Sequence, residues 1–215
     1  MCSEYAEIAF RSYLNVKQRY QFYKGCDFNV DIFRELGLIN QKAIVAVVFA
    51  QMSIESFLND YAAACLGDNE FYDNFDKLDV ISKLQLIVKF ILHKKLDKSR
   101  EPFTSLKTLN KQRNNYIHNK SYYLDLSQSN FQDIDIETYA GIAYAEELKS
   151  LKEILKEAKT AMKTITEIIK FFEERDDNIH AVHRFFAFGV DPIDLDISEI
   201  KQELNNLGLN YEIQI

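Results

Sequence analysis

The residues best suited to chemistry lie in one short run, Lys111–Lys120, which reads KQRNNYIHNK. Arg113 is followed by the polar Asn114, and His118 comes five positions after the arginine. Histidine is the side chain that gains and loses a proton near neutral pH. Arginine presents a permanent, planar array of donors that matches phosphate oxygens. This pair suits phosphodiester cleavage without metal, in which a base takes the 2′-hydroxyl proton, an acid protonates the leaving 5′-oxygen, and a cation stabilises the phosphorane.

The geometry of this run sets two conditions on that chemistry. On a continuous helix, side chains five residues apart diverge by about 140°. Arg113 and His118 would face one cleft if the helix ended or tightened near Tyr116, with Tyr116 and Ile117 anchoring the turn in the core. One histidine in each chain supplies one group for two proton transfers, so a two-fold interface would bring in the second copy. The products expected are a 2′,3′-cyclic phosphate and a 5′-hydroxyl, with Asn114 orienting the arginine or a phosphate oxygen.

Arg113, Asn114 and His118, at the end of a helix in an all-helical chain, resemble the signature of the HEPN superfamily. That signature is an arginine, four to six residues and a histidine, usually with Asn, Asp or His after the arginine. The resemblance covers residues 3–174 and implies a metal-independent endoribonuclease whose motifs meet at a dimer interface, often as a toxin or phage-defence effector. One departure is that Asn119 and Lys120 follow the histidine, where some members have any residue and then tyrosine.

Glu55 is a further candidate, because it interrupts an otherwise apolar helix in which an unpaired carboxylate would be costly to bury. The resemblance implies that Glu55, with Gln51 or Asn59, orients Arg113 from the neighbouring helix. The alternative is that its carboxylate reaches solvent at the edge of the bundle.

The distribution of charge favours a phosphate-bearing partner despite a net charge of −7. Residues 83–120 hold ten basic and two acidic residues, which is a net +8 and leaves −15 for the rest of the chain. A basic stretch on an acidic body can bind phosphate while the body repels other contacts. We expect Lys107, Lys111 and Lys120 to guide RNA phosphates to the site, although a solvated helix face would carry the same lysines.

Three rival interpretations stay open. Arg113 would pair with an acid, and His118 would cap a helix C-terminus, if the motif were structural. The same spacing recurs at Arg175 and His180, within an acidic cluster that would repel RNA. A non-catalytic helical module that binds RNA, a nucleotide or a protein partner is the alternative function.

His180 and His183 have no third ligand at a sensible spacing, so we expect no metal and no cofactor.

The elements that must position these residues are predicted to be helices, since the chain has only 6 glycines and 2 prolines. Apolar periodicity and capping residues predict six helices, and the last long one repeats apolar residues at spacings of three and four. The predicted ranges are 3–24, 41–66, 80–96, 102–118, 139–174 and 198–206. The expected fold is an all-α, up-down bundle of four to five main helices over 1–190, followed by a C-terminal extension over 191–215.

The remaining features indicate a soluble, cytoplasmic protein. The three cysteines have no ligand spacing, and we expect reduced, mostly buried thiols. The N-terminus has no basic-then-apolar start, and the longest apolar run, 43–50, is far shorter than the ~20 residues that span a bilayer. The expected partners are an RNA substrate, a second copy of the chain and an antitoxin or regulatory protein, with no membrane.

Overall fold

Every element that the structure describes is a helix. The structure is a computed structural model that describes residues 1–27, 30–117, 136–176, 178–186 and 197–209. Within these ranges there is no strand, so the predicted all-α class is confirmed. The helices are α1 (Cys2–Tyr23), α2 (Val30–Leu66), α3 (Asp68–Asn74), α4 (Val80–Leu86), a π-helical turn η1 (Ile87–Ile91), α5 (Phe103–Ile117), α6 (Ile136–Glu173), α7 (Ala181–Phe185) and α8 (Ile197–Asn206).

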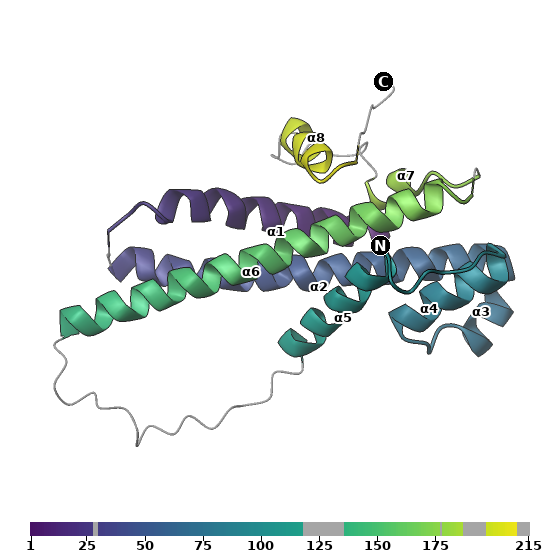
Figure 1. The fold of residues 1–215 in the computed structure, drawn as a ribbon, viewed down its shortest axis with the longest axis horizontal. Coiled ribbons are helices and arrows are strands. Elements are labelled where there is room, and N and C mark those ends of the chain that lie inside the picture. The colour runs from purple at the N-terminus through teal and green to yellow at the C-terminus, as the bar shows by residue number, and fades with distance from the viewer. Residues whose placement is uncertain (28–29, 118–135, 177, 187–196, 210–215) are drawn as a thin grey trace, which may run out of the picture.

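The body of the molecule is built around α2. Figure 1 shows α1, α2 and α6 running side by side along the long axis, with α5 on one side of them and α8 on the other. Helix α2 contacts α1, α3, α4, α5, α6 and α7. Its apolar stretch includes the fully buried Ala43, Ala46, Val47, Ala50 and Ile54. A helix that is apolar on all sides has to be covered on all sides, which explains its central place.

The central helix also passes a length-and-hydropathy test for a membrane-crossing helix. Residues Leu38–Leu66 have a mean hydropathy of 1.3 in their most apolar window, although their longest unbroken apolar run is the eight residues 43–50. Half of that window is buried inside the fold, where α1, α5 and α6 pack against it. In this structure the segment is a core helix.

Most predicted helices are confirmed to within three residues at their described ends. The apolar seam of α6 is core, with Leu151, Ala158, Met162, Ile165 and Ile169 fully buried. Two expectations were wrong. The sequence favours Asn40 as the cap of a helix that begins at residue 41, but α2 begins at Val30, and Asn40 lies inside it with its side chain donating a hydrogen bond to Glu147 on α6. Ile8 and Phe22, which the apolar pattern of the predicted helix 3–24 places in the core, are exposed.

The predicted helix 80–96 changes character halfway. Asp79 caps α4 as its sequence indicates, accepting from the backbone N–H groups of Ile81 and Ser82. After Leu86 the chain forms the π-turn, and His93 then adopts a left-handed conformation with φ 52°. A residue in this conformation commonly ends a helix, although glycine is the usual occupant. The residues after Leu92 therefore leave the helix and lead towards α5.

The C-terminal extension docks on α1. The Glu203 carboxylate of α8 is buried and accepts hydrogen bonds from the Tyr13 hydroxyl at 2.8 Å and from Lys17 Nζ at 2.5 Å. Leu204, Leu207 and Leu209 join the main core. Burial alone would raise the pKa of Glu203, but the hydrogen bonds from Lys17 and Tyr13 outweigh it and hold that pKa below its usual value. The extension is thus fixed by apolar burial and by one ionised carboxylate.

We expect the docking of α8 to weaken in acid. A carboxylate whose pKa is lowered by folding stabilises the folded form above its ordinary pKa of about 4.3, and loses that contribution as the pH falls through the lowered value. Hydrogen exchange of the α8 amides should therefore accelerate as the pH falls from neutrality to below about 4, after correction for the intrinsic rate. Glu203→Gln should show fast exchange already at neutral pH, and Glu153→Gln, at an exposed carboxylate on α6, should behave as wild type. Wild-type protection in Glu203→Gln would contradict this account.

Candidate functional site

The candidate site lies on α5, whose buried face fixes its place in the bundle. Phe103, Ser105, Leu106 and Leu109 are buried, and the helix contacts α2, α4 and α6. The opposite face carries the exposed Lys107, Lys111 and Asn114. At 100° per residue these three side chains fall within about 60° of one another, over about 10 Å of helix. The predicted RNA-binding lysines 107 and 111 therefore share one solvent-facing stripe with the polar residue of the motif.

Arg113 lies on the packed face of α5, one and two turns after the buried Leu109 and Leu106, and is turned about 100° or more around the helix from each residue of that stripe. Its Nη1 donates a hydrogen bond to Asn114 Oδ1 at 3.1 Å, so the predicted partnership of these two residues is present. Its Nε is buried and has no hydrogen-bond partner among the described residues. No carboxylate lies within 4.0 Å of the guanidinium in the described part of the chain. The guanidinium thus keeps donors available for an anionic ligand.

The last turn of α5 is anchored by one residue rather than two. The Tyr116 hydroxyl donates a hydrogen bond to Glu157 on α6, and its ring packs against the core. Burial, and then this hydrogen bond, raise the pKa of Tyr116, so it stays a neutral donor. Ile117, which was expected in the core, is 45% exposed. His118 and Lys120 lie outside the described residues, and the described part of α5 ends at Ile117.

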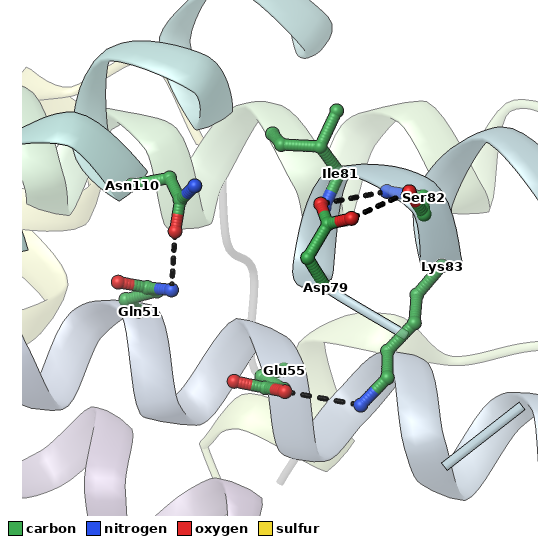
Figure 2. Close-up of polar contacts among 7 residues, drawn as sticks. All are labelled: Gln51, Glu55, Asp79, Ile81, Ser82, Lys83 and Asn110. Carbon is green, nitrogen blue, oxygen red and sulfur yellow. Dashed lines mark hydrogen bonds and ion pairs between the residues drawn. The ribbon is translucent and has the colours of Figure 1, made fainter. Parts of the chain in front are cut away.

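A polar contact inside the bundle joins α5 to α2. Gln51 is buried, and its Nε2 donates to Asn110 Oδ1 at 2.9 Å (Figure 2). Asn110 comes one helical turn before Arg113 and Asn114. A buried amide pair is satisfied at one relative position of two helices, so this bond helps to fix the register of α5 on α2.

Glu55 has a different partner from the one expected. Its Oε1 accepts a hydrogen bond from Lys83 Nζ of α4 at 3.0 Å (Figure 2). The Lys83 side chain is 2% exposed and that of Glu55 is 36% exposed. The structure therefore places Glu55 with Lys83 and at the edge of solvent, and shows no hydrogen bond or ion pair between Glu55 and Arg113. Glu55 balances a buried ammonium group, which explains why an apolar helix contains a carboxylate.

Lys83 is not a surface charge. It was counted among the surface charges of residues 83–120, but it is one of the largest fully buried side chains. The signal that would have found it is its position in the apolar periodicity, one residue before the buried Leu84 and four before Ile87.

The second arginine–histidine pair is engaged internally. Arg175 Nη1 donates to the Phe171 carbonyl oxygen at 3.1 Å and to Glu174 Oε2 at 3.0 Å, and its guanidinium stacks over the Phe171 ring. The nearby Asp176 accepts a hydrogen bond from Tyr61, and this bond lowers the pKa of its carboxyl. Arg175 thus has the carboxylate partner that Arg113 lacks within the described chain.

The other expectations on ligands concern metals and thiols. In the described ranges no group of three or more His, Cys, Asp or Glu side chains is arranged to hold a metal ion. The three cysteines are free, but only Cys2 is buried, whereas Cys65 is exposed. Burial raises the pKa of Cys2 to about 12, so this thiol is unreactive.

We expect Glu55→Gln to destabilise the fold by about 3 kcal/mol, because it leaves the ammonium of Lys83 buried and uncompensated. Lys83→Met should rescue most of that loss in the double variant, because it removes the buried charge. Urea denaturation of the two single variants and the double variant measures the coupling. If Glu55→Gln instead abolished cleavage of RNA at unchanged stability, Glu55 would belong to the catalytic site.

Comparison with known proteins adds no relative. No family model, no curated protein and no solved structure matches this chain. What the chain does must therefore be inferred from its own residues and their geometry.

Proposed function

We propose that the chain is a metal-independent endoribonuclease of the HEPN type, which acts as a homodimer and uses Arg113 and His118. The observation that carries the proposal is the state of Arg113. Its guanidinium is held by Asn114, is unpaired with any carboxylate in the described residues, and belongs to the helix that also carries the exposed Lys107 and Lys111. In a chain with net charge −7, such a group indicates an anionic ligand supplied from outside.

Each residue has a distinct role in this proposal. The neutral His118 of one subunit takes the proton from the 2′-hydroxyl, whose oxygen attacks the adjacent phosphorus. Arg113 donates to the phosphorane oxygens, and the charged His118 of the other subunit gives its proton to the leaving 5′-oxygen. The bonds broken and formed leave a 2′,3′-cyclic phosphate and a 5′-hydroxyl. Asn114 is a positioning residue, because its carbonyl oxygen holds Arg113 Nη1.

The exposed Ile117 supports a two-fold interface at this place. A large apolar side chain that is 45% exposed lies between the anchored Tyr116 and His118. Burial of such a side chain against a second copy would add apolar area at the point where two motifs must meet. Helix α8 does not compete for this surface, since it docks on α1, on the other side of the long helices from α5 (Figure 1).

The biological role proposed with this activity is that of a toxin or phage-defence effector in the cytoplasm, restrained by an antitoxin or another regulatory protein. This part derives from the HEPN resemblance alone. The competing proposal is a helical module that binds RNA, a nucleotide or a protein partner without cutting it, for which the lysine stripe of α5 would suffice.

Cleavage assays with matched variants separate the two proposals. Labelled total RNA and tRNA are incubated in EDTA with wild type, His118→Ala, Arg113→Lys and His180→Ala. We expect wild type to leave 2′,3′-cyclic phosphate ends and His118→Ala to lose about a hundredfold to ten-thousandfold in rate. Arg113→Lys keeps the charge but loses the planar fork, and should lose about a hundredfold. His180→Ala, in the second motif, should cut as wild type does.

The outcomes that oppose the nuclease are equally clear. Binding of RNA by pure dimer without any cleavage would leave the binding module as the better account. Loss of cleavage in His180→Ala, with none in His118→Ala, would move the site to the second motif.

The dimer is tested with Ile117→Asp. A carboxylate at this position would have to be desolvated in the interface, so we expect the variant to be monomeric in sedimentation and inactive. Ile142→Asp, at a similarly exposed isoleucine on α6, is the matched control and should remain dimeric and active. A dimeric Ile117→Asp, or an active monomer, would contradict the proposed interface.

A further inference from the structure

An exposed aromatic side chain lies among lysines at the end of the π-turn, away from the residues used so far. Phe90 is 59% exposed. Lys89 Nζ lies 4.8 Å from the centroid of its ring. Exposure of a phenylalanine ring to water is unfavourable, and a ligand that covers the ring removes this cost. The ammonium group near the ring adds a positive charge at the same place. The segment thus presents an aromatic face and positive charge together.

The backbone holds this face in place. Ile87 and Val88 are fully buried and anchor the turn in the core. Leu92 N–H donates to the Ile87 carbonyl oxygen at 2.9 Å, and Lys94 N–H donates to that of Val88 at 2.9 Å. The left-handed conformation of His93 closes the second of these bonds. Lys89 and Phe90 therefore project from an ordered turn, and π-turns of this kind are frequent at functional sites.

The charge that follows the turn is not neutralised. Lys94 and Lys95 are exposed, and neither has a carboxylate within 4.0 Å among the described residues. The nearest acid in sequence, Asp97, forms an ion pair with Arg100 and accepts from Ser99, and it interacts with Lys95 only at longer range. Two ammonium groups without an ion pair, four and five residues after an exposed aromatic ring, match the alternation of phosphate and base along a nucleic-acid strand.

We propose that Phe90, with Lys89, Lys94 and Lys95, forms a binding platform for single-stranded RNA, separate from the cleavage site. A base stacks on the Phe90 ring, and the phosphates on either side of it contact Lys94 and Lys95. The choice of RNA as the ligand rests on the proposed ribonuclease function. The single strand follows from the aromatic face, because bases within a duplex are stacked on each other and offer no free face.

The position of the platform in the chain connects it to the proposed cleavage site. The segment after His93 leads from the π-turn to the start of α5 (Figure 1), where Lys107 and Lys111 continue the basic series. Basic residues thus follow the chain from the platform to Arg113. An RNA strand long enough to reach both the platform and the cleavage site would make contacts at both. We therefore expect the affinity for RNA to rise with the length of its single-stranded region.

Binding is measured by fluorescence anisotropy with a labelled 2′-O-methyl oligouridine, over a series of salt concentrations and against the same strand in a duplex. The probe has no 2′-hydroxyl and cannot be cleaved by transesterification, so the result does not depend on nuclease activity. Wild type should bind the single strand more tightly than the duplex. Phe90→Ala should weaken binding at least about fivefold without changing the salt dependence. Lys94→Gln with Lys95→Gln should lower the slope of log K against log salt by about 1.4.

Matched controls exclude general surface effects. Tyr72 on α3 is 63% exposed but lies among acidic residues, and Tyr72→Ala should bind as wild type does. Lys149→Gln with Lys152→Gln on α6 removes two exposed lysines elsewhere and should leave the slope less affected than the Lys94 and Lys95 pair. Wild-type affinity in Phe90→Ala, an unchanged slope in the lysine variant, or no preference for the single strand would each overturn the platform. If cleavage is absent while these effects are present, the nuclease fails and the platform stands.

Discussion

The structure depends on the burial of α2. Its stretch from Ala43 to Ile54 has no exposed residue: the buried side chains fill one half of the helix and those on the other half are partly buried, so no single partner helix can cover it. Covering it requires α1 and α6 along its length, α5 on a further side, and the short helices α3, α4 and α7 near its C-terminal half. Each of these helices is either short or amphipathic, because only one of its faces packs on α2. The place of Arg113 follows from this constraint, since Arg113 lies at the C-terminal end of the face by which α5 packs, whereas Lys107, Lys111 and Asn114 lie on the exposed face.

Polar groups enter the core where they fix one arrangement of the helices. Gln51 meets Asn110, Glu55 meets Lys83, and Glu203 meets Tyr13 and Lys17. Each pair joins helices that lie far apart in the sequence or that are separated by a turn. An apolar contact tolerates a shift of one helix along another, whereas a buried charge or amide is satisfied at one position only. These contacts therefore set the register of α5, α4 and α8 on a core that apolar burial alone would leave less well defined.

The long helices could be predicted from sequence because their apolar residues repeat with the helical period, and Gly67 marks the end of α2. Asp79 and Gly208 likewise mark the start of α4 and the end of α8. The start of α2 could not be predicted, because Asn40 looks like a cap until α6 supplies Glu147 as its partner. The short α3 and α7 lack enough turns to show a period. In the candidate site, sequence alone placed Arg113, Asn114, Lys107 and Lys111 on one helix. It did not reveal that Glu55 belongs to Lys83, because that contact joins residues 28 positions apart and is decided by packing.

The covalent attachment of α8 changes what its docking means. Ten residues, 187–196, join it to the segment that ends α7, so its contact with α1 is an intramolecular event. A contact between two parts of one chain is governed by an effective concentration, which can reach roughly the millimolar range. A helix that would bind α1 only weakly as a free peptide is then bound nearly all the time. A separate molecule that bound the same surface of α1, around Tyr13 and Lys17, would have to exceed that effective concentration or bind much more tightly than α8 does. This surface is therefore closed to weak competitors and open to a strong one.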